Sequence, residues 1–499
     1  MNVKSLLLKP FKFRTMQMHR FSTLFLSLCF LFTIWSGERV TAQKIWTLED
    51  CINFALENNL DINKQMLTVE GNKKALLQSG LNMLPNLNAN GTNFWNFGQT
   101  IDQYTNTFAT TTVRSNNFYI SSNVMLFGGL QKLNTFKANK INLLASQYDL
   151  DVIKNNISLS VAGYYLDILF NLELLGVAKE QLRITTAQSE RIQKMVDAGS
   201  SARGDLLNIN AQKATEELNV VDATNRLSIS NLSLQQLIDL TVTRDFTIEK
   251  PALKDVKAPL DQITTEVIFE KAMKTRPEIR AAELRVEAAH KRLAIARGYV
   301  QPVLSLSGSW GTGYSGAAME VDPGSMGDTT WKAIGITQQS KDIVLMPQID
   351  YRYRVKDFSE QLKDNSNQSV GFSLSVPIFN GWQGRNAISQ AKIQKTQAEI
   401  DLDIKTRDLR KLIEQAFADA VSALQKYNAS GEKVAAQNEA FKYAQQKFDV
   451  GMMTSFDYNN TKKDLTKAES DLLQAKYDFI FKSTILDFYM GNPIRINRE

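Results

Sequence analysis

Two short stretches of the sequence, DAGSSARGDLLN (197–208) and DVGMMTSFDYNN (449–460), share the pattern D-x-G-x5-D-x2-N. Their other letters differ, but Asp, Gly, Asp and Asn recur at the same four offsets. The agreement extends beyond both stretches when the second is placed 252 residues after the first, so that Phe127 matches Phe379. We therefore interpret the chain as two internal structural repeats.

The offset between the two copies changes to 217 further upstream, where Pro85 matches Pro302. The difference of 35 residues places an insertion in the second copy, within about 317–368. The resulting organisation is a signal peptide (1–42), a first repeat (43–240), an inter-repeat linker (241–265), a second repeat (266–490) and a C-terminal tail (491–499).

The first 42 residues have the pattern of a signal peptide. A basic segment is followed by the apolar run 21–35, which is too short for a comfortable membrane span, and small residues precede Gln43. Removing this leader lowers the formal charge from +6 to +1, so the basic isoelectric point does not indicate nucleic-acid binding. Lipidation at Cys29 is an alternative, but the preceding LSL lacks the small residues that such a cleavage site needs.

Apolar residues at three- and four-residue spacing predict one helix from Thr47 to about 83 and an equivalent helix from Glu266 to about 299. The prolines at 85 and 302 end them, because proline cannot continue the helical hydrogen bonds. The three- and four-residue spacing of apolar residues returns over about 130–196 and 383–450, and then over 203–240 and 455–490. These ranges are therefore also predicted to be helices. At 1.5 Å per residue the longer helices would extend roughly 100 Å, a length typical of coiled coils.

Between the helices the apolar period changes to two, which predicts β-strands. Each copy contains two such strands, in hairpins at about 86–127 and 303–379, so the chain has four. A small closed barrel needs about eight strands, so several chains must contribute to one barrel. We also expect no apolar run of 18 residues after the leader. An exported protein without such a run is either soluble or a β-barrel.

The paired motifs fall where one long helix ends and the next begins. Gly199 and Gly451 stand where a helix end favours a left-handed residue, and Asp205 and Asp457 fall in the first turn of the following helix. The motif is therefore predicted to form the tip of a helical hairpin. The residues expected at the strand–helix junctions are Pro85, Pro302, Phe127, Gly129, Phe379 and Gly381.

The sequence offers little support for an enzyme, a metal site or a cofactor. His290, the one histidine after the leader, lies in a Lys/Arg/Ala-rich helix typical of a surface position. GTGYSG (311–316) matches a dinucleotide-binding pattern, but it follows a strand and opens no helix. Cys51 has no partner histidine and is better explained as a packing residue. We predict a protein that is not an enzyme.

Several motifs in this order resemble the TolC family of outer-membrane efflux proteins. They are WTLEDCINFALENNLDI (46–62), LPNLN (84–88), LFGGLQ (126–131), IFNGWQG (378–384) and the paired G-x5-D tips. The resemblance covers essentially the whole chain after the leader.

The resemblance implies an α+β membrane protein that forms a homotrimer. Its porin-like channel would have a shared 12-stranded outer-membrane β-barrel, with four strands per chain, continued by a long α-helical barrel in the periplasm. The family would make this chain the exit channel of a tripartite efflux or type I secretion system. Its partners would be outer-membrane lipid, a periplasmic adaptor (membrane fusion) protein and an inner-membrane RND or ABC transporter. The alternative is an exported soluble coiled-coil scaffold or adhesin, which would not need four half-apolar strands.

In the family, acidic residues at the inner hairpins line the periplasmic entrance. The resemblance therefore assigns Asp457, and also Asp205, to a constriction or gate, together with Asn460 and Asn208 where well-known members carry a second Asp. The alternative is structural, because Thr454 and Asp457 have the spacing of a capping box. The Tyr and Arg that lock the entrance in those members align with Phe448 and Met453, so a lock in this chain requires other contacts.

Overall fold

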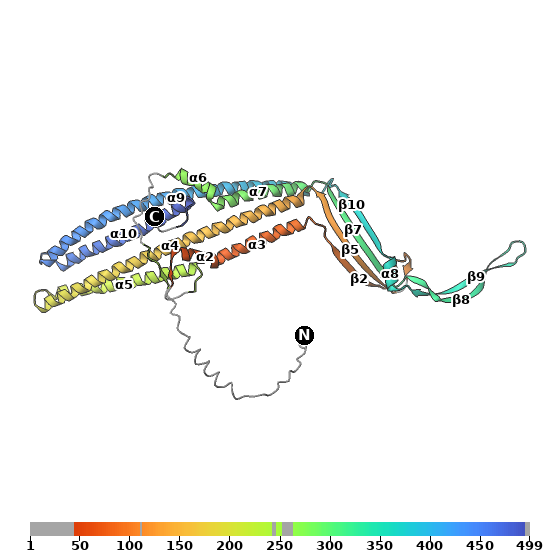
Figure 1. Ribbon diagram of the computed structural model, residues 1–499, viewed down its shortest axis with the longest axis horizontal. Helices are drawn as coiled ribbons and strands as arrows, with labels where there is room; N and C mark the ends of the chain where they lie inside the picture. The colour runs from red at the N-terminus through yellow and green to blue at the C-terminus, as the bar shows by residue number, and fades with distance from the viewer. Residues whose placement is uncertain (1–43, 110–111, 242–245, 252–262, 495–499) are drawn as a thin grey trace, which may run out of the picture.

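Two long helical hairpins form one end of the molecule, and a sheet with a protruding ribbon forms the other (Figure 1). The computed structural model describes residues 44–109, 112–241, 246–251 and 263–494. The expected signal peptide, Cys29, most of the linker and the end of the tail lie outside these residues.

The two hairpins have helices of equal length. Helices α4 (Gln131–Asp197) and α9 (Gln383–Asp449) each contain 67 residues, and α5 (Arg203–Leu237) and α10 (Ser455–Tyr489) each contain 35. Every boundary in the second hairpin lies 252 residues after its counterpart in the first. These ends follow the sequence expectation to within a few residues.

The shorter helices differ from the expectation of one continuous helix in each copy. They are α2 (Leu48–Asn58), α3 (Leu60–Leu81), α6 (Thr265–Thr275) and α7 (Pro277–Gly298). Asn59 is extended, and its side chain accepts hydrogen bonds from the first amides of α3, so it ends one helix and caps the next. In the second copy Pro277 occupies the first turn of α7 and holds Arg276 in an extended conformation.

Two apolar clusters hold the helices together at mid-length. One joins α2, α4, α5 and α10 around Tyr165 and includes Cys51; the other joins α6, α9 and α10 around Phe479. Strands β1 (Ile45–Trp46) and β6 (Thr247–Ile248) form a small parallel pair beside the first cluster. Because α10 contributes to both clusters, it connects the two halves of the chain.

Helix α4 corrects the expectation that no later apolar stretch is long enough to span a membrane. It contains an 18-residue window that is apolar enough to do so, and 44% of that window is buried inside the structure. Several buried residues of α4, among them Leu166 and Leu169, pack in the first cluster. Burial against other helices therefore accounts for this apolar stretch.

The four strands expected from the sequence form one antiparallel sheet in the order β10-β7-β5-β2. The strands are β2 (Asn88–Asn96), β5 (Val113–Gly128), β7 (Val303–Ser315) and β10 (Asn367–Ser375). Among the described residues, no strand pairs with the outer edge of β2 or of β10. The sheet is therefore open on both sides.

The two faces of this sheet differ in chemistry, because residues directly opposite on neighbouring strands share a face. One face is apolar, as in the row Phe372, Leu306 and Val124. The other is polar and small, as in the row Ser369, Ser309 and Ser121. An alternation of this kind is typical of a barrel wall with lipid outside and water inside.

The insertion of the second copy is ordered as strands and a helix rather than as a loop. Strands β8 (Met319–Ile336) and β9 (Ile343–Val355) pair as an antiparallel ribbon, and α8 (Phe358–Asp364) leads back to the sheet. A smaller hairpin of β3 (Thr100–Ile101) and β4 (Phe108–Ala109) lies between β2 and β5 in the chain. The ribbon continues away from the helices beyond the sheet (Figure 1).

Candidate functional site

Each long hairpin turns at a glycine in the left-handed conformation. Gly199 has φ 75° and Gly451 has φ 76°. The amide of Ser200 donates to the carbonyl of Met195, and the second hairpin makes the equivalent bond. These are the bonds of a Schellman turn, in which glycine avoids the steric cost of a positive φ.

Asp457 lies exposed in the first turn of α10, where it is part of a helix cap. Thr454 Oγ1 accepts a hydrogen bond from the Asp457 amide at 3.2 Å and donates to its carboxylate at 2.7 Å. This geometry is that of a capping residue. The same carboxylate remains exposed at the hairpin tip, so the cap does not remove its charge from the surface.

Asp205 is half-buried and has a different partner. Ser201 Oγ donates a 3.0 Å hydrogen bond to its carboxylate, whereas the N-cap of α5 is Ala202, which has no side-chain cap. Asn208 and Asn460 are both exposed on the next helical turn. Each aspartate thus accepts at least one side-chain hydrogen bond from its own hairpin tip.

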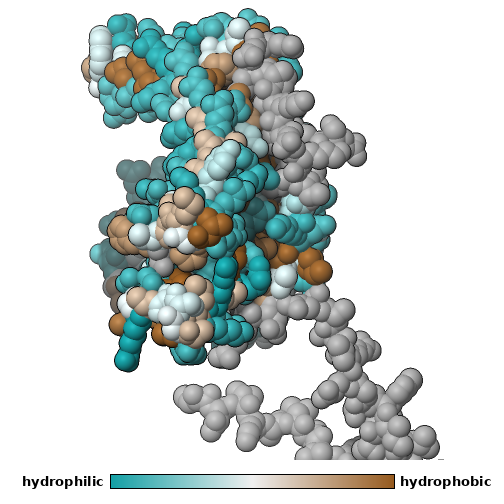
Figure 2. Space-filling view, turned by 90° about the vertical axis from the view of Figure 1, so that its left-hand side faces the viewer, coloured by the Kyte–Doolittle hydropathy of each residue, from teal (hydrophilic) through white to brown (hydrophobic). Residues whose placement is uncertain are grey.

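The end of the molecule formed by the tips is largely hydrophilic and carries separate apolar residues (Figure 2). Met452 and Phe456 in the second tip and Leu207 in the first are exposed. Single exposed apolar side chains of this kind are common on protein surfaces. The tips therefore combine acidic groups with apolar side chains.

Three polar contacts join the two hairpins close to their tips, and sequence reasoning did not find them. Their members on α4 are spaced three residues apart. The contacts are Thr185 with Lys462 at 2.7 Å, Gln188 with Tyr458 at 2.5 Å, and Arg191 with Asp449 at 2.8 Å. We call these three contacts the hairpin lock. Asp449 is the first residue of the second copy of the repeated motif. One residue of the hairpin lock was therefore already marked by the sequence pattern.

Phe448 and Met453, which align with locking residues of the family, do not make these polar contacts. Phe448 stacks on Tyr458 with ring centroids 4.7 Å apart. It supports the ring whose hydroxyl accepts the hydrogen bond from Gln188 Nε2. A lock of the entrance in this chain therefore stays a prediction, and the three polar contacts are candidates for it.

Lys462 is a charged member of the hairpin lock and is buried, with 4% of its surface exposed. Burial lowers the pKa of its ammonium group, and the nearby Glu216 carboxylate partly opposes this effect. Glu216 is also buried and accepts hydrogen bonds from Gln212 and Asn219. Lys462 bonds to a hydroxyl on the other hairpin and has a carboxylate nearby. The contact between the hairpins therefore depends on the charge of this lysine.

The strand–helix junctions use the expected residues in strained or exposed positions. Gly129 has φ 59°, and a Cβ there would lie 2.6 Å from the Cα of Gly298. Gly381 has φ 62° with open space around it. Pro85 and Pro302 lie between the short helices and the strands.

Exposed aromatic residues occur at both ends of the sheet. Phe127, Phe379 and Trp382 lie near the helical end, and Trp95 and Trp310 lie toward the ribbon. Aromatic side chains at two levels are typical of the two interfaces of a membrane.

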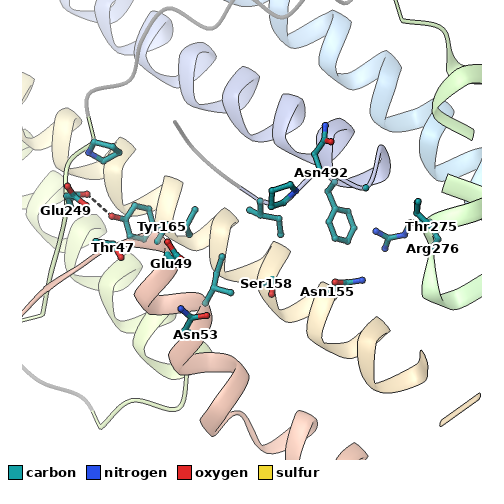
Figure 3. Close-up of a pocket in the computed structure, with 17 residues that line it drawn as sticks. Thr47, Glu49, Asn53, Asn155, Ser158, Tyr165, Glu249, Thr275, Arg276 and Asn492 are labelled. Carbon is teal, nitrogen blue, oxygen red and sulfur yellow. Dashed lines mark hydrogen bonds between the residues drawn. The ribbon is translucent and has the colours of Figure 1, made fainter. Parts of the chain in front are cut away.

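A cleft of about 1030 Å³ lies at mid-length between the two halves of the chain (Figure 3). Its charged side chains are Glu49, Glu249 and Arg276. Arg276 pairs with Glu278 and stacks on Phe488, which gives it a structural role. Nearby, burial raises the pKa of the Cys51 thiol to about 12, so this thiol is a poor nucleophile.

Comparisons with known proteins agree with this architecture. The chain matches the family model described as outer membrane efflux protein over residues 51–239 and 268–492. It is 21% identical to the outer membrane efflux protein BepC of Brucella suis biovar 1 (strain 1330), over 74% of this chain and 70% of that protein. It is 20% identical to the outer membrane protein TolC of Escherichia coli (strain K12), over 67% of this chain and 61% of that protein.

A solved structure of CusC superimposes with a TM-score of 0.71 at 18% sequence identity, covering 89% of this chain and 92% of that one. The family match spans both hairpins and the sheet between them. The chain therefore belongs to the TolC-like family of outer membrane efflux proteins, and it is an efflux channel of the outer membrane that extends into the periplasm.

Proposed function

We propose that three copies of this chain close one 12-stranded barrel. The observation that carries this proposal is the four-stranded sheet, which has one apolar face, one polar face and two unpaired edges. Strands β2 and β10 run in opposite directions, so β10 of one copy can pair with β2 of the next in the antiparallel pattern of the rest of the sheet. Three copies remove every free edge, which a membrane requires.

The long helices then continue the channel as a helical barrel in the periplasm. Within each chain the equal helix lengths and the constant offset of 252 residues support an internal duplication. Three chains would present six similar hairpin tips in one ring. The acidic and apolar tip residues make this ring a suitable docking surface for a periplasmic adaptor of an inner-membrane RND or ABC transporter.

In this assembly the chain conducts its cargo passively and catalyses no reaction of its own. The inner-membrane partner supplies the energy, in tripartite efflux or in type I secretion. The hairpin lock holds the two hairpins of one chain together, and its release would let one hairpin swing away from the channel axis. Asp457, and to a lesser extent Asp205, would then contribute negative charge to the entrance, with Asn460 and Asn208 beside them.

Cysteine cross-linking across the proposed seam tests the assembly. Asn90→Cys on β2 is combined in turn with Ser369→Cys, Gly371→Cys or Ser373→Cys on β10, all on the polar face of the sheet. One of these registers is expected to give covalent trimers on a denaturing gel. Single variants serve as controls and give covalent dimers at most. Protein that reaches the outer membrane but gives no intermolecular disulfide in any register would refute the shared barrel.

Protease treatment of intact cells tests the orientation. The ribbon lies at the opposite end of the sheet from the helices, so it should project outside the cell and be cut first. Cleavage that occurs only after the outer membrane is broken would show that the orientation is inverted.

A further inference from the structure

The ribbon of β8 and β9 has one continuous apolar face. Side chains alternate along β9, so its odd-numbered residues share one face and its even-numbered residues share the other. The odd-numbered residues are Ile343, Leu345, Pro347, Ile349, Tyr351, Tyr353 and Val355. Their partners on β8 are Met319, Val321, Met326, Thr329, Trp331, Ala333 and Ile336, of which only Thr329 is polar. We call this surface the apolar ribbon face.

The opposite face is polar along most of its length. It carries Gln348, Asp350, Arg352 and Arg354 on β9, opposite Glu320 and Thr330 on β8. The ion pair of Arg354 with Glu320 at 2.8 Å satisfies charges within this face. The apolar residues Val344 and Met346 also lie on this face, but only near the tip of the ribbon.

The apolar ribbon face is exposed along its whole length in the single chain. Tyr353, Trp331 and Ile343 are each about two-thirds exposed, at 64%, 64% and 65%. An isolated two-stranded ribbon is only marginally stable in water, and apolar patches of this extent mark contact surfaces. The ribbon therefore requires a partner along this face.

The base of the ribbon is fixed by buried polar contacts. Gln361 of α8 donates from Nε2 to the carbonyls of Ser315 and Lys356 and accepts from the Ser315 amide through Oε1. Ser315 Oγ in turn donates to the carboxylate of Asp102, and all three side chains of Ser315, Gln361 and Asp102 are buried. These contacts connect the strand before the ribbon with the helix after it and so fix where the ribbon leaves the sheet.

The ribbon leaves the sheet beside the proposed seam between chains. After β9 the chain passes through α8 directly into β10, whose outer edge is unpaired. The ribbon also runs onward from the far end of the sheet instead of folding back beside it (Figure 1). The ribbon is therefore connected to the strand at which a neighbouring copy would pair.

The expected spacing of three ribbons agrees with such contact. Twelve strands about 4.8 Å apart and tilted by about 40° form a barrel with a radius of about 12 Å, so equivalent rim positions lie about 20 Å apart. Apolar sheet faces pack about 10 Å apart. Each ribbon is about 40 Å long, at 3.3 Å per residue. A modest tilt of the ribbons toward the channel axis therefore brings their apolar faces together.

We propose that the apolar ribbon faces of three copies pack against one another around the channel axis and form a collar above the outer mouth. This inference rests on the proposed trimer. The packed apolar faces would lie on the channel axis above the outer mouth, with the polar ribbon faces toward water. Cargo would leave through the gaps between the bases of the three ribbons instead of along the axis.

Cross-linking at matched positions of β9 tests the collar. Leu345→Cys lies on the apolar ribbon face, and Gln348→Cys, its control three residues away, lies on the polar face. Both variants are treated in intact cells with a short bismaleimide. Cys51 does not compete for the reagent, because it is buried and its thiol pKa is raised to about 12.

The collar predicts covalent dimers from Leu345→Cys at a yield at least about fivefold above that from Gln348→Cys. Equal yields, or capture of a protein of another mass by Leu345→Cys, would overturn it. The seam variants of β2 and β10 are treated in parallel. Seam cross-links without ribbon cross-links would refute the collar alone, whereas the absence of both would refute the trimer on which it rests.

A second variant removes apolar character without a cysteine. Leu345→Asp combined with Tyr353→Asp should expose the ribbon to external protease and increase the rate of cleavage severalfold while the seam cross-links persist. Gln348→Asp, on the polar face, should leave the rate unchanged. Unchanged cleavage of the double variant would show that the apolar ribbon face was never covered by its neighbours.

Discussion

Lys462 Nζ on α10 donates a 2.7 Å hydrogen bond to Thr185 Oγ1 on α4, and both side chains are buried between the two hairpins. The ammonium group therefore holds two hairpins together and also carries a buried charge. Burial favours its neutral form, while the nearby Glu216 favours the charged form. The contact is thus specific but costly, which suits a joint that must open.

Replacing Lys462 with Met should make the folded chain no less stable and should weaken the contact between the hairpins. Methionine fills a similar volume and removes a charge that burial disfavours, because the pKa of Lys462 is lowered in the folded chain. We expect a larger fraction of open channels in planar bilayers and an unchanged or higher unfolding temperature. A lower unfolding temperature with unchanged opening would show that Lys462 only supports the packing.

The pH dependence of stability should differ between wild type and Lys462→Met. Because the folded-state pKa of Lys462 is lowered below 10.5, the unfolded chain binds more protons in the interval between the two pKa values. Wild type should therefore gain stability relative to the variant as pH rises through that interval, and the difference should be constant below it. A difference in unfolding temperature that does not change with pH would contradict this assignment.

Reversing the charge of Arg191 should release the outermost contact of the hairpin lock. Arg191 and Asp449 are 59% and 42% exposed, so their pairing contributes only about 0.2–1 kcal/mol. Arg191→Glu should then raise the ratio of open to closed channels by about 1.5- to 5-fold. The double variant Arg191→Glu with Asp449→Arg should restore the wild-type ratio. Failure of the second substitution to restore it would exclude this pair from gating.

Two substitutions separate the capping and gating roles of the second tip. Thr454→Ala removes the cap and should cost about 0.5–2 kcal/mol of stability with little change in conductance. Asp457→Ala should change the conductance and its sensitivity to divalent cations, because it removes one charge per chain from the entrance. Asp205→Ala is compared in the same recordings. If both aspartate variants conduct and respond to cations like wild type, the repeated aspartate is purely structural.

The strand–helix junctions of the two copies should respond differently to the same change. Gly381→Ala introduces a left-handed alanine into open space, which costs about 1–2 kcal/mol. Gly129→Ala adds a clash with the backbone of Gly298 and should cost clearly more. Thermal unfolding of the two variants in detergent measures the difference. Equal losses would mean that the backbone at Gly298 moves to accommodate the new methyl group.

Much of the fold could be predicted from the sequence because local signals marked the ends of its elements. Gly199 and Gly451 marked the hairpin tips, and the constant offset between copies placed the long helices within a few residues. The break at Asn59 was missed because a capping asparagine inside a helical pattern resembles an ordinary polar position. The break before Pro277 carried a signal, since the residue before proline avoids the helical conformation.

The candidate site was less predictable, because its contacts join residues far apart in the sequence. Thr185 and Lys462 are 277 positions apart, and nothing local to either residue indicates that they meet. The β8 strand of the ribbon was hidden for a different reason, whereas the stretch 343–355 of β9 has the composition of a strand. Pro323 and the glycines of β8 suggest turns, and the strand accommodates them through irregularities in its register with β9.

A gated channel must conduct ions, so planar-bilayer recording of the purified protein is the decisive measurement. Wild type and the double variant Arg191→Glu, Lys462→Met are compared in the same bilayers, with vesicle flotation to show that both have inserted. We expect unitary current steps from both preparations, with a larger conductance or open fraction in the double variant. Inserted protein that gives no unitary currents in either form would show that the chain does not form a gated channel.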